Sequence, residues 1–392
     1  MKNILYIHHV SDIGGGSYCL LNIIRELDRT SYKPYVLLKT YGPLVDELKL
    51  MGVECLFLSL LSTVPYNRTL FSPRSVLQYL RVFKSRSSLG DILSKYHFDI
   101  VYLNNMMLWP YLKVAKSSGA HTIYHVREHW PLNEHKVQLK WARSAVYKYA
   151  DRLVAINKYS ASMFPDKKST IVYDWVDLET RKSSESLNDL LGCDVSGKKI
   201  YLFTGGRSSI KGAFEVCKTF SESVKDPDAR LLVLGWTPFP AFKGPRHIVQ
   251  LILRHFGRLY YNFDLCSVIK KDDRILTIPP TYYIKSILES CYCMVSYFTI
   301  PHANLALAEG VISKKVVIAA ETEESLEYTN NGKYAILYPF NDIKSFSECL
   351  STVSDRYDEV QTNLLTGSLD VAKMFDREIN SKRLSDVYNF VE

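Results

Sequence analysis

The sequence lacks an apolar run approaching the roughly 20 residues that a membrane-spanning helix needs. Its eight cysteines show no CxxC spacing, and most lie in apolar runs where a thiol behaves as a small hydrophobic group, so we expect them to be reduced. Residues 1–10 form a strand-like run that contains polar His8 and His9 and does not resemble a signal peptide. These absences favour a cytoplasmic protein over a secreted or membrane-spanning one.

Negative charge is scarce in the first half of the chain. Residues 1–190 carry 25 of the 49 Lys and Arg residues but only 17 of the 41 Asp and Glu residues, so this half holds the whole net charge of +8. A basic half can bind nucleic acid, anionic lipid or an acidic substrate, and charge alone does not choose among them. The sequence contains no RNA- or DNA-binding motif, so we expect no nucleic-acid partner.

Length and composition predict two domains. A chain of 392 residues, 47% of them hydrophobic, exceeds what one core usually organises. In the first half, short apolar runs alternate with helix-like stretches, which predicts a parallel sheet covered by helices on both faces. The six strands expected there are 4–7, 35–38, 53–58, 100–103, 122–126 and 153–156.

A polar stretch at 179–199 interrupts this alternation and is interpreted as the linker between domains. The alternation then resumes, which predicts a second parallel sheet, and residues 368–392 have helical spacing. Two such sheets predict a ligand-binding cleft at the carboxyl ends of their strands. The strands expected in the second sheet are 200–203, 231–234, 275–278, 294–297, 316–319 and 335–337.

A glycine-rich loop follows the first strand. Gly14, Gly15 and Gly16 allow the backbone to approach a ligand closely, and Ser17 is expected to cap the helix whose free amides favour oxygen-rich groups. The loop is neither GxGxxG nor a P-loop, and a tight turn without a ligand explains it equally well.

The second predicted domain opens with a similar loop that also carries cations. Gly206 is followed by Arg207 and Lys211, which together are suited to clamp a diphosphate from two sides. The alternative is a pair of solvated loop charges. The glycines and the preceding strand favour phosphate binding.

A third motif lies between the strands expected at 294–297 and 316–319. Asn304 is a candidate N-cap, and the helix expected to begin beyond it at Leu305 would point free amides at a ligand. Glu309, about one turn further on, is placed to accept hydrogen bonds from a vicinal diol such as a ribose. The alternative is a surface carboxylate on an amphipathic helix. Most of the acidic residues at 321–327 are expected to be solvated.

Taken in order, these motifs resemble glycosyltransferase family 4, whose members are retaining enzymes with the GT-B fold. The resemblance covers essentially the whole chain. Its matching segments are 14–16, 125–128, 151–156, 206–207, 211–212, 309, and 327 with the turn at 330–332.

The resemblance implies an α/β fold of two Rossmann-like domains that face each other across a cleft. Residues 1–180 would bind the acceptor and residues 195–370 the nucleotide-sugar. A C-terminal helix, residues 371–392, would pack back on the first domain.

The resemblance also assigns roles to single residues. Arg207 and Lys211 match residues that hold the donor diphosphate, and Glu309 matches the residue that holds the nucleotide ribose. His125 matches a histidine near the donor sugar and the acceptor, with Arg127 and Glu128 beside it. Without the family context, His125 is a strand-end residue and Arg127 with Glu128 a local ion pair. The substrate-binding residues assigned in this way are Gly14, Gly15, Gly16, Ser17, Arg127, Glu128, Gly206, His302, Asn304, Leu305 and Glu309.

The chain departs from the family pattern at Pro301. The family has a pair of glutamates separated by seven residues, and Pro301 occupies the position of the first, which usually touches the donor sugar. Either His302 or Asn304 takes over that contact, or the donor sugar is an unusual one. The departure also leaves open a nucleotide-sugar-binding protein without turnover, and a sugar-nucleotide epimerase of related fold is a third interpretation.

For the reaction, the resemblance implies front-face displacement with His125, Arg207 and Lys211 as the catalytic set. We expect no metal ion, because residues 226–228 are interpreted as a turn, and no cofactor, because the nucleotide-sugar is a substrate. The expected acceptor is a glycan or a lipid-linked sugar in bacterial surface polysaccharide synthesis.

A basic segment at 72–86 is predicted to be a helix. It carries four cations and an apolar face of Val76, Leu77, Leu80 and Phe83, a pattern that suits a helix lying on an anionic membrane. A helix that covers the sheet explains the pattern equally well. The surplus positive charge favours peripheral contact with the inner face of the plasma membrane.

Overall fold

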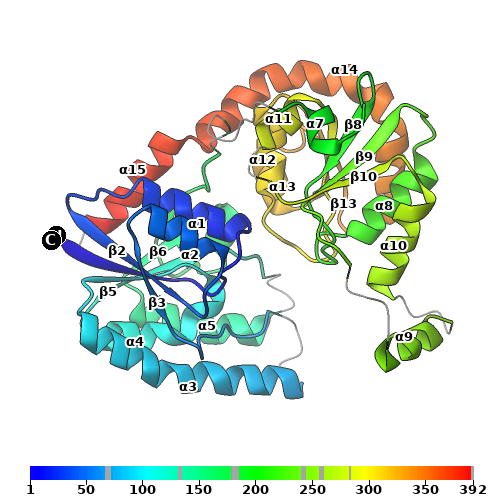
Figure 1. The fold of residues 1–392 in the computed structure, drawn as a ribbon. Helices are drawn as coiled ribbons and strands as arrows, with labels where there is room; N and C mark the ends of the chain where they lie inside the picture. The colour runs from blue at the N-terminus through cyan, green and yellow to red at the C-terminus, as the bar shows by residue number, and fades with distance from the viewer. Residues whose placement is uncertain are drawn as a thin grey trace. The chain divides into compact units, whose positions relative to one another are not determined.

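The structure is a computed structural model that describes residues 1–66, 72–130, 135–176, 178, 185–239, 244–255, 260–281 and 284–389. The chain divides into two compact units (Figure 1). The first unit is Met1–Trp175 together with Phe375–Glu392, and the second is Val176–Met374.

The first unit contains a seven-stranded parallel sheet with the strand order β3-β2-β1-β4-β5-β6-β7. The order reverses between β1 and β4, which are neighbours although two strands intervene in sequence. Its strands are β1 Lys2–Ile7, β2 Tyr32–Leu38, β3 Glu54–Phe57, β4 Ile100–Leu103, β5 His121–Val126, β6 Arg152–Ala155 and β7 Ser169–Ile171.

Alternating residues of β1 face two different helix layers. Ile4 and Tyr6 pack with buried residues of α1, α2 and α15, whereas Leu5 and Ile7 pack with those of α3, α4 and α5. The sheet is therefore buried on both faces, as its continuous apolar strands predict. The helices of this unit are α1 Gly15–Arg25, α2 Pro43–Leu50, α3 Pro73–Tyr96, 3-10 helix η1 Met106–Tyr111, α4 Leu112–Ser117, α5 Lys136–Tyr149, α6 Lys158–Ser162 and α15 Arg377–Tyr388.

The second unit contains a six-stranded parallel sheet with the order β10-β9-β8-β11-β12-β13, and this order reverses between β8 and β11. Its strands are β8 Lys199–Phe203, β9 Ala229–Leu234, β10 Ile275–Ile278, β11 Cys291–Val295, β12 Val316–Glu321 and β13 Ile336–Pro339. Its helices are α7 Leu187–Leu191, α8 Ala213–Ser223, α9 Pro245–His255, α10 Tyr261–Lys271, α11 Ile284–Glu289, α12 Leu305–Ile312, α13 Glu323–Tyr328 and α14 Ile343–Met374.

The C-terminal segment is two helices rather than one. α14 ends at Met374, and a new helix begins at Arg377 because the Asp376 carboxylate accepts a hydrogen bond from the amide of Ile379 at 2.8 Å and so caps it. α15 belongs to the first unit, where the Tyr388 hydroxyl lies 3.0 Å from that of Tyr6. Part of the expected linker also has structure, since Ser186 caps α7.

Within the described residues, no helix is long and apolar enough to cross a bilayer. α3 does cover the sheet, with Ser75, Val82, Ser85, Leu89 and Leu93 buried. The four residues of its predicted apolar face lie elsewhere on the helix and are 42 to 59% exposed.

Candidate functional site

In the second unit, two loops meet at the point where the strand order reverses. One follows β8 and carries Arg207 and Lys211, and the other follows the neighbouring β11 and leads into α12. They are tied together because Thr299 donates its amide to the carbonyl of Ile210 at 2.9 Å and its hydroxyl to that of Ser209 at 3.0 Å. Open α/β sheets bind ligands at this position.

Gly206 allows two backbones to meet at the base of this site. It has a φ of +55°, and a Cβ there would lie 2.4 Å from the carbonyl oxygen of Gly235, which follows β9. Only glycine fits both constraints. The start of the loop between β8 and α8 therefore requires a glycine at position 206.

The Arg207 side chain is oriented by the loop after β9. Its Nε donates to the hydroxyl of Thr237 at 2.8 Å, and its guanidinium carbon lies 5.6 Å from the centre of the Phe239 ring. Nη1 of Arg207 is buried and has no hydrogen-bond partner among the described residues. A positioned guanidinium with an unused donor suits an incoming phosphate oxygen.

Lys211 and Glu309 interact electrostatically across the two loops. Burial lowers the pKa of Lys211, and the negative charge of Glu309 opposes that shift. Glu309 lies in the second turn of α12 and is only 7% exposed. The structure therefore brings Gly206, Arg207, Lys211 and Glu309 to one edge of one sheet, and we call these four residues the Arg207–Glu309 cluster.

Asn304 is the N-cap of α12, as predicted. Its side-chain oxygen accepts from the amide of Leu307 at 3.3 Å, and its side-chain nitrogen donates to the hydroxyl of Ser296 at 2.9 Å. Its backbone amide donates to Glu324 at 3.0 Å. The side chain of Asn304 is thus already occupied by structural contacts, while the ring centre of His302 lies 5.6 Å from that of Phe298.

The buried position of Glu324 was not predicted. Its side chain is 3% exposed, although most of the acidic segment was expected to be solvated. The bond to Asn304 explains this burial, since a buried carboxylate needs a donor. Leu305, the first residue of α12, follows directly on this cap.

In the first unit, Ser17 does not cap α1 as predicted. The helix begins at Gly15 with Gly14 as the N-cap and no side-chain cap. Ser17 instead donates its hydroxyl to the carbonyl of Asp12 at 2.7 Å and lies 3.1 Å from Nε2 of His8. The Ser17 side chain thus ties the first turn of α1 back to the glycine loop at Asp12 and to the residue that follows β1.

His8 links this loop to the neighbouring strand β4. Its Nδ1 lies 3.2 Å from the side-chain nitrogen of Asn104, the residue after β4, and both side chains are at most 3% exposed. Burial lowers the pKa of His8, and the charges of His9 and Arg127 lower it further. A neutral imidazole therefore lies at the point where the strand order reverses.

His125, near the end of β5, is fully buried and held by two donors. The hydroxyl of Tyr102 lies 2.7 Å from Nδ1, and Nη1 of Arg127 lies 3.5 Å from the same nitrogen. Burial and the charge of Arg127 lower the pKa of His125. Its Nε2 is buried without a hydrogen-bond partner in the described part of the chain.

Arg127 does not pair with Glu128, contrary to the interpretation that treats them as a local ion pair. Its Nη2 donates to Asp174 at 2.6 Å, and although burial alone would lower the pKa of Arg127, Asp174 raises it. Glu128 instead accepts from the amide of Met106 at 2.6 Å and from Asn105. Burial raises the pKa of Glu128 to about 7 against these hydrogen bonds.

The predicted site residues thus fall into two groups, one in each unit. The first unit holds the glycine loop with Ser17, and His125 with Arg127 and Glu128. The second holds the Arg207–Glu309 cluster with His302, Asn304 and Leu305. Among the described residues, no group of three or more His, Cys, Asp or Glu could hold a metal ion.

Residues 13–180 match the family model described as Glycosyltransferase Family 4. This part of the chain is similar to glycosyltransferase family 4. The resemblance inferred from the motifs is thereby confirmed. No curated protein sequence matches this chain significantly.

Solved structures confirm the GT-B fold of this chain. It is similar to Anabaena HepE in complex with UDP-glucose, with a TM-score of 0.72, 17% identity, and coverage of 99% of this chain and 100% of that one. It is also similar to the lipopolysaccharide outer core galactosyltransferase WaaB, with a TM-score of 0.57, 16% identity, and coverage of 97% and 99%. A protein from Listeria monocytogenes described as a UDP-N-acetylglucosamine 2-epimerase matches with a TM-score of 0.61, 12% identity, and coverage of 98% and 95%.

Proposed function

We propose that this glycosyltransferase moves a sugar from a UDP-sugar to a glycan or lipid-linked acceptor, with retention at the anomeric carbon and without a metal ion. The observation that carries the proposal is the Arg207–Glu309 cluster, where two cations and a buried carboxylate lie at the reversal of strand order in the second sheet. Cations suit a diphosphate, and a carboxylate suits the ribose hydroxyls.

In the proposed reaction, the bond between the sugar C1 and the diphosphate oxygen breaks as the acceptor oxygen bonds to C1 on the same face. The acceptor proton passes to the departing diphosphate, so no enzyme nucleophile is needed. Arg207 and Lys211 stabilise the charge that develops on the leaving group. The single donor at Nε2 of His125 would hydrogen bond a hydroxyl of the donor sugar or the acceptor.

UDP is the proposed donor nucleotide because the similar HepE structure contains UDP-glucose. A role in surface polysaccharide synthesis is proposed from the similarity to WaaB, a lipopolysaccharide galactosyltransferase by its description.

A second candidate is a nucleotide-sugar-binding protein without turnover, and Pro301 favours it. A proline has no side-chain donor or acceptor for the donor sugar, and the side chain of Asn304 is committed to the α12 cap and to Ser296. If the protein does turn over, His302 is therefore a better candidate than Asn304 for the contact to the donor sugar that the missing glutamate would make.

We also propose that the enzyme contacts an anionic membrane through α3. Val76, Leu77, Leu80 and Phe83 are 42 to 59% exposed on this helix, and cations of the same helix flank them. Amphipathic helices with an apolar face and Lys or Arg beside it lie in membrane interfaces.

The test begins with thermal stabilisation by UDP, GDP and ADP, of which UDP should give the largest shift. Transfer is then measured with radiolabelled UDP-sugars, with and without EDTA, and NMR of the product gives the anomeric configuration. We expect transfer with retention that EDTA does not reduce. Stabilisation by UDP without transfer or hydrolysis of any donor would favour the binding protein, and interconversion of the donor without acceptor would favour an epimerase.

A further inference from the structure

The first unit contains an open polar cavity of about 330 Å³ at the carboxyl ends of β1, β2 and β3. Its lining includes three cations and no carboxylate. The lining residues are His9, Lys39, Leu61, Ser62, Thr63, Arg74, Gln78 and Arg81. Its volume is at the lower end of the range for small-molecule sites, about 300–1,000 Å³.

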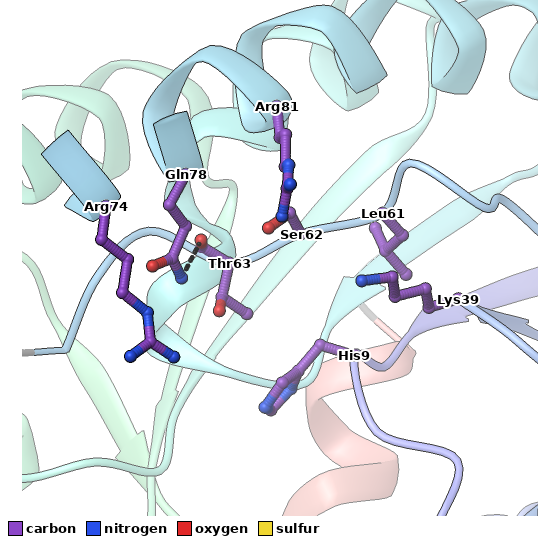
Figure 2. Close-up of a pocket in the computed structure, with 8 residues that line it drawn as sticks. All are labelled: His9, Lys39, Leu61, Ser62, Thr63, Arg74, Gln78 and Arg81. Carbon is purple, nitrogen blue, oxygen red and sulfur yellow. Dashed lines mark hydrogen bonds between the residues drawn. The ribbon is translucent and has the colours of Figure 1, made fainter. Parts of the chain in front are cut away.

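The cations reach the cavity from opposite sides. Arg74, Gln78 and Arg81 recur at helical spacing on α3 and so share one side of the helix, while His9 and Lys39 follow the ends of β1 and β2 (Figure 2). In the part of the chain that the structure describes, none of the three cations lies within ion-pair distance of a carboxylate. No carboxylate among the described residues therefore neutralises their charges.

The polar wall between them is fixed in place. Gln78 donates its side-chain nitrogen to the carbonyl of Thr63 at 2.8 Å, which ties α3 to the loop after β3 (Figure 2). The hydroxyl of Tyr111 lies 3.2 Å from the amide and 2.8 Å from the carbonyl oxygen of Ser62. Since these bonds use the backbone, the side chains of Ser62 and Thr63 add hydroxyls to the cavity lining.

We propose that this cavity binds the phosphate or diphosphate group of the acceptor. The inference rests on the proposed transferase function and specifies its acceptor. Two guanidinium groups can each offer two donors to phosphate oxygens, and Lys39 adds a point charge. The cavity lies wholly in the first unit, whereas the proposed donor diphosphate site lies in the second.

The structure favours a lipid diphosphate as the source of the phosphate group that the cavity binds. The exposed Leu77 and Leu80 each precede a cavity-lining residue, Gln78 and Arg81, and lie about 100° around the helix from it. A lipid tail on the apolar face of α3 and a diphosphate among the arginines would thus occupy adjoining sides of one helix. His9 at the base supplies a neutral ring, because burial lowers its pKa to about 4.

The test measures binding of inorganic pyrophosphate and of farnesyl diphosphate by calorimetry. Saturating UDP is present throughout so that the donor site is occupied. The double variant Arg74→Gln/Arg81→Gln should bind pyrophosphate at least 10-fold more weakly than the wild type. The matched control is Lys84→Gln, an exposed cation of the same helix outside the cavity lining, which should change affinity less than 2-fold.

Tighter binding of farnesyl diphosphate than of pyrophosphate would identify a lipid source, and equal binding a soluble phosphorylated acceptor. The proposal is overturned if the wild type does not bind pyrophosphate beside UDP, or if the double variant binds it as the wild type does. UDP-dependent stabilisation of each variant is measured separately. If UDP does not stabilise the wild type, the donor site and hence the transferase function are refuted. The pyrophosphate result would still show whether the cavity binds a phosphate group.

Discussion

Nη1 of Arg127 lies 3.5 Å from Nδ1 of His125. A guanidinium can only donate, so Nδ1 is the unprotonated nitrogen of the neutral ring and the proton is on Nε2. Burial of the ring and, after it, the positive charge of Arg127 lower the pKa of His125, so both favour the neutral form. His125 is therefore a hydrogen-bond donor at neutral pH and not a general base.

Replacement of His125 should separate these two roles. His125→Phe removes the donor, and we expect kcat to fall about 100-fold, as for other positioned donors at a reacting centre. His125→Gln keeps an N–H near the position of Nε2 and should retain activity within about 10-fold of the wild type. If His125 were a general base, both variants would lose activity to the same extent. The pH profile of the wild type would then show the titration of that base. Steady-state kinetics from pH 5.5 to 8.5 distinguishes the two.

Lys211→Ala and Glu309→Ala should each weaken UDP binding about 10- to 100-fold, because each removes a charged partner of the donor. Folding should change little for Lys211→Ala, since burial already disfavours its charge. Calorimetry with UDP and thermal unfolding give the two readouts. Lys218→Ala, an exposed cation on α8, is the control and should change neither. Unchanged UDP affinity in both site variants would remove the proposed donor site.

Gly206→Ala should destabilise the second unit and weaken UDP binding. The substitution forces a left-handed φ on a residue with a Cβ, at about 1–2 kcal/mol, and also drives that Cβ into the carbonyl oxygen of Gly235. Gly197→Ala is a matched control, because Gly197 has a φ of +72° but no heavy atom within 4 Å of its added Cβ. The free energy of unfolding should therefore fall more for Gly206→Ala. Equal losses would mean that the close approach of the two backbones contributes nothing.

Many strands of the fold can be predicted from the local sequence pattern, and a comparison of two strands shows why. The run 100–103 is apolar throughout because β4 is covered on both faces, and β4 spans these same residues. β7, by contrast, has only three residues, two of them Ser169 and Thr170, and carries no comparable signal. Length and apolarity decide whether a strand can be recognised from sequence.

The contacts between distant segments could not be predicted in this way. Arg127 pairs with Asp174, 47 residues away, and the cavity joins Lys39 to Arg81. These contacts depend on the order of strands in the sheet, which places β1 beside both β2 and β4 and which no single segment encodes. The adjacent positions of Arg127 and Glu128 suggest a local ion pair, but the Glu128 carboxylate instead accepts a hydrogen bond from the amide of Met106.

Glu128 should make the protein less stable as pH rises. Its pKa is about 7 in the folded protein against 4.5 in the unfolded chain, so the folded state binds more protons between these values. The stabilisation from the protonated carboxyl is complete below pH 4.5 and is lost as pH passes through 7. Glu128→Gln mimics the protonated form and should gain stability over the wild type between pH 5 and pH 8, by at most about 3 kcal/mol.

Urea unfolding of both proteins across this pH range gives that difference. Glu54→Gln, at a half-exposed carboxylate on β3 of the same unit, is the control for loss of a carboxylate elsewhere. A constant difference for Glu128→Gln would show that Glu128 is ionised throughout.

Membrane binding should depend on the exposed leucines of α3. Leu77 and Leu80 are 56% and 59% exposed, and inserting a leucine into an apolar phase is worth roughly 1.5–3 kcal/mol. Leu77→Gln/Leu80→Gln should therefore lower binding to vesicles of phosphatidylcholine and phosphatidylglycerol at least 10-fold in a sedimentation assay. Leu50→Gln, at the end of α2, is a matched control because Leu50 is 84% exposed in the same unit but lies off α3. Vesicles of phosphatidylcholine alone should bind the wild type more weakly, since they do not attract the cations of α3. Equal sedimentation of the double variant and the wild type would show that α3 does not contact the lipid.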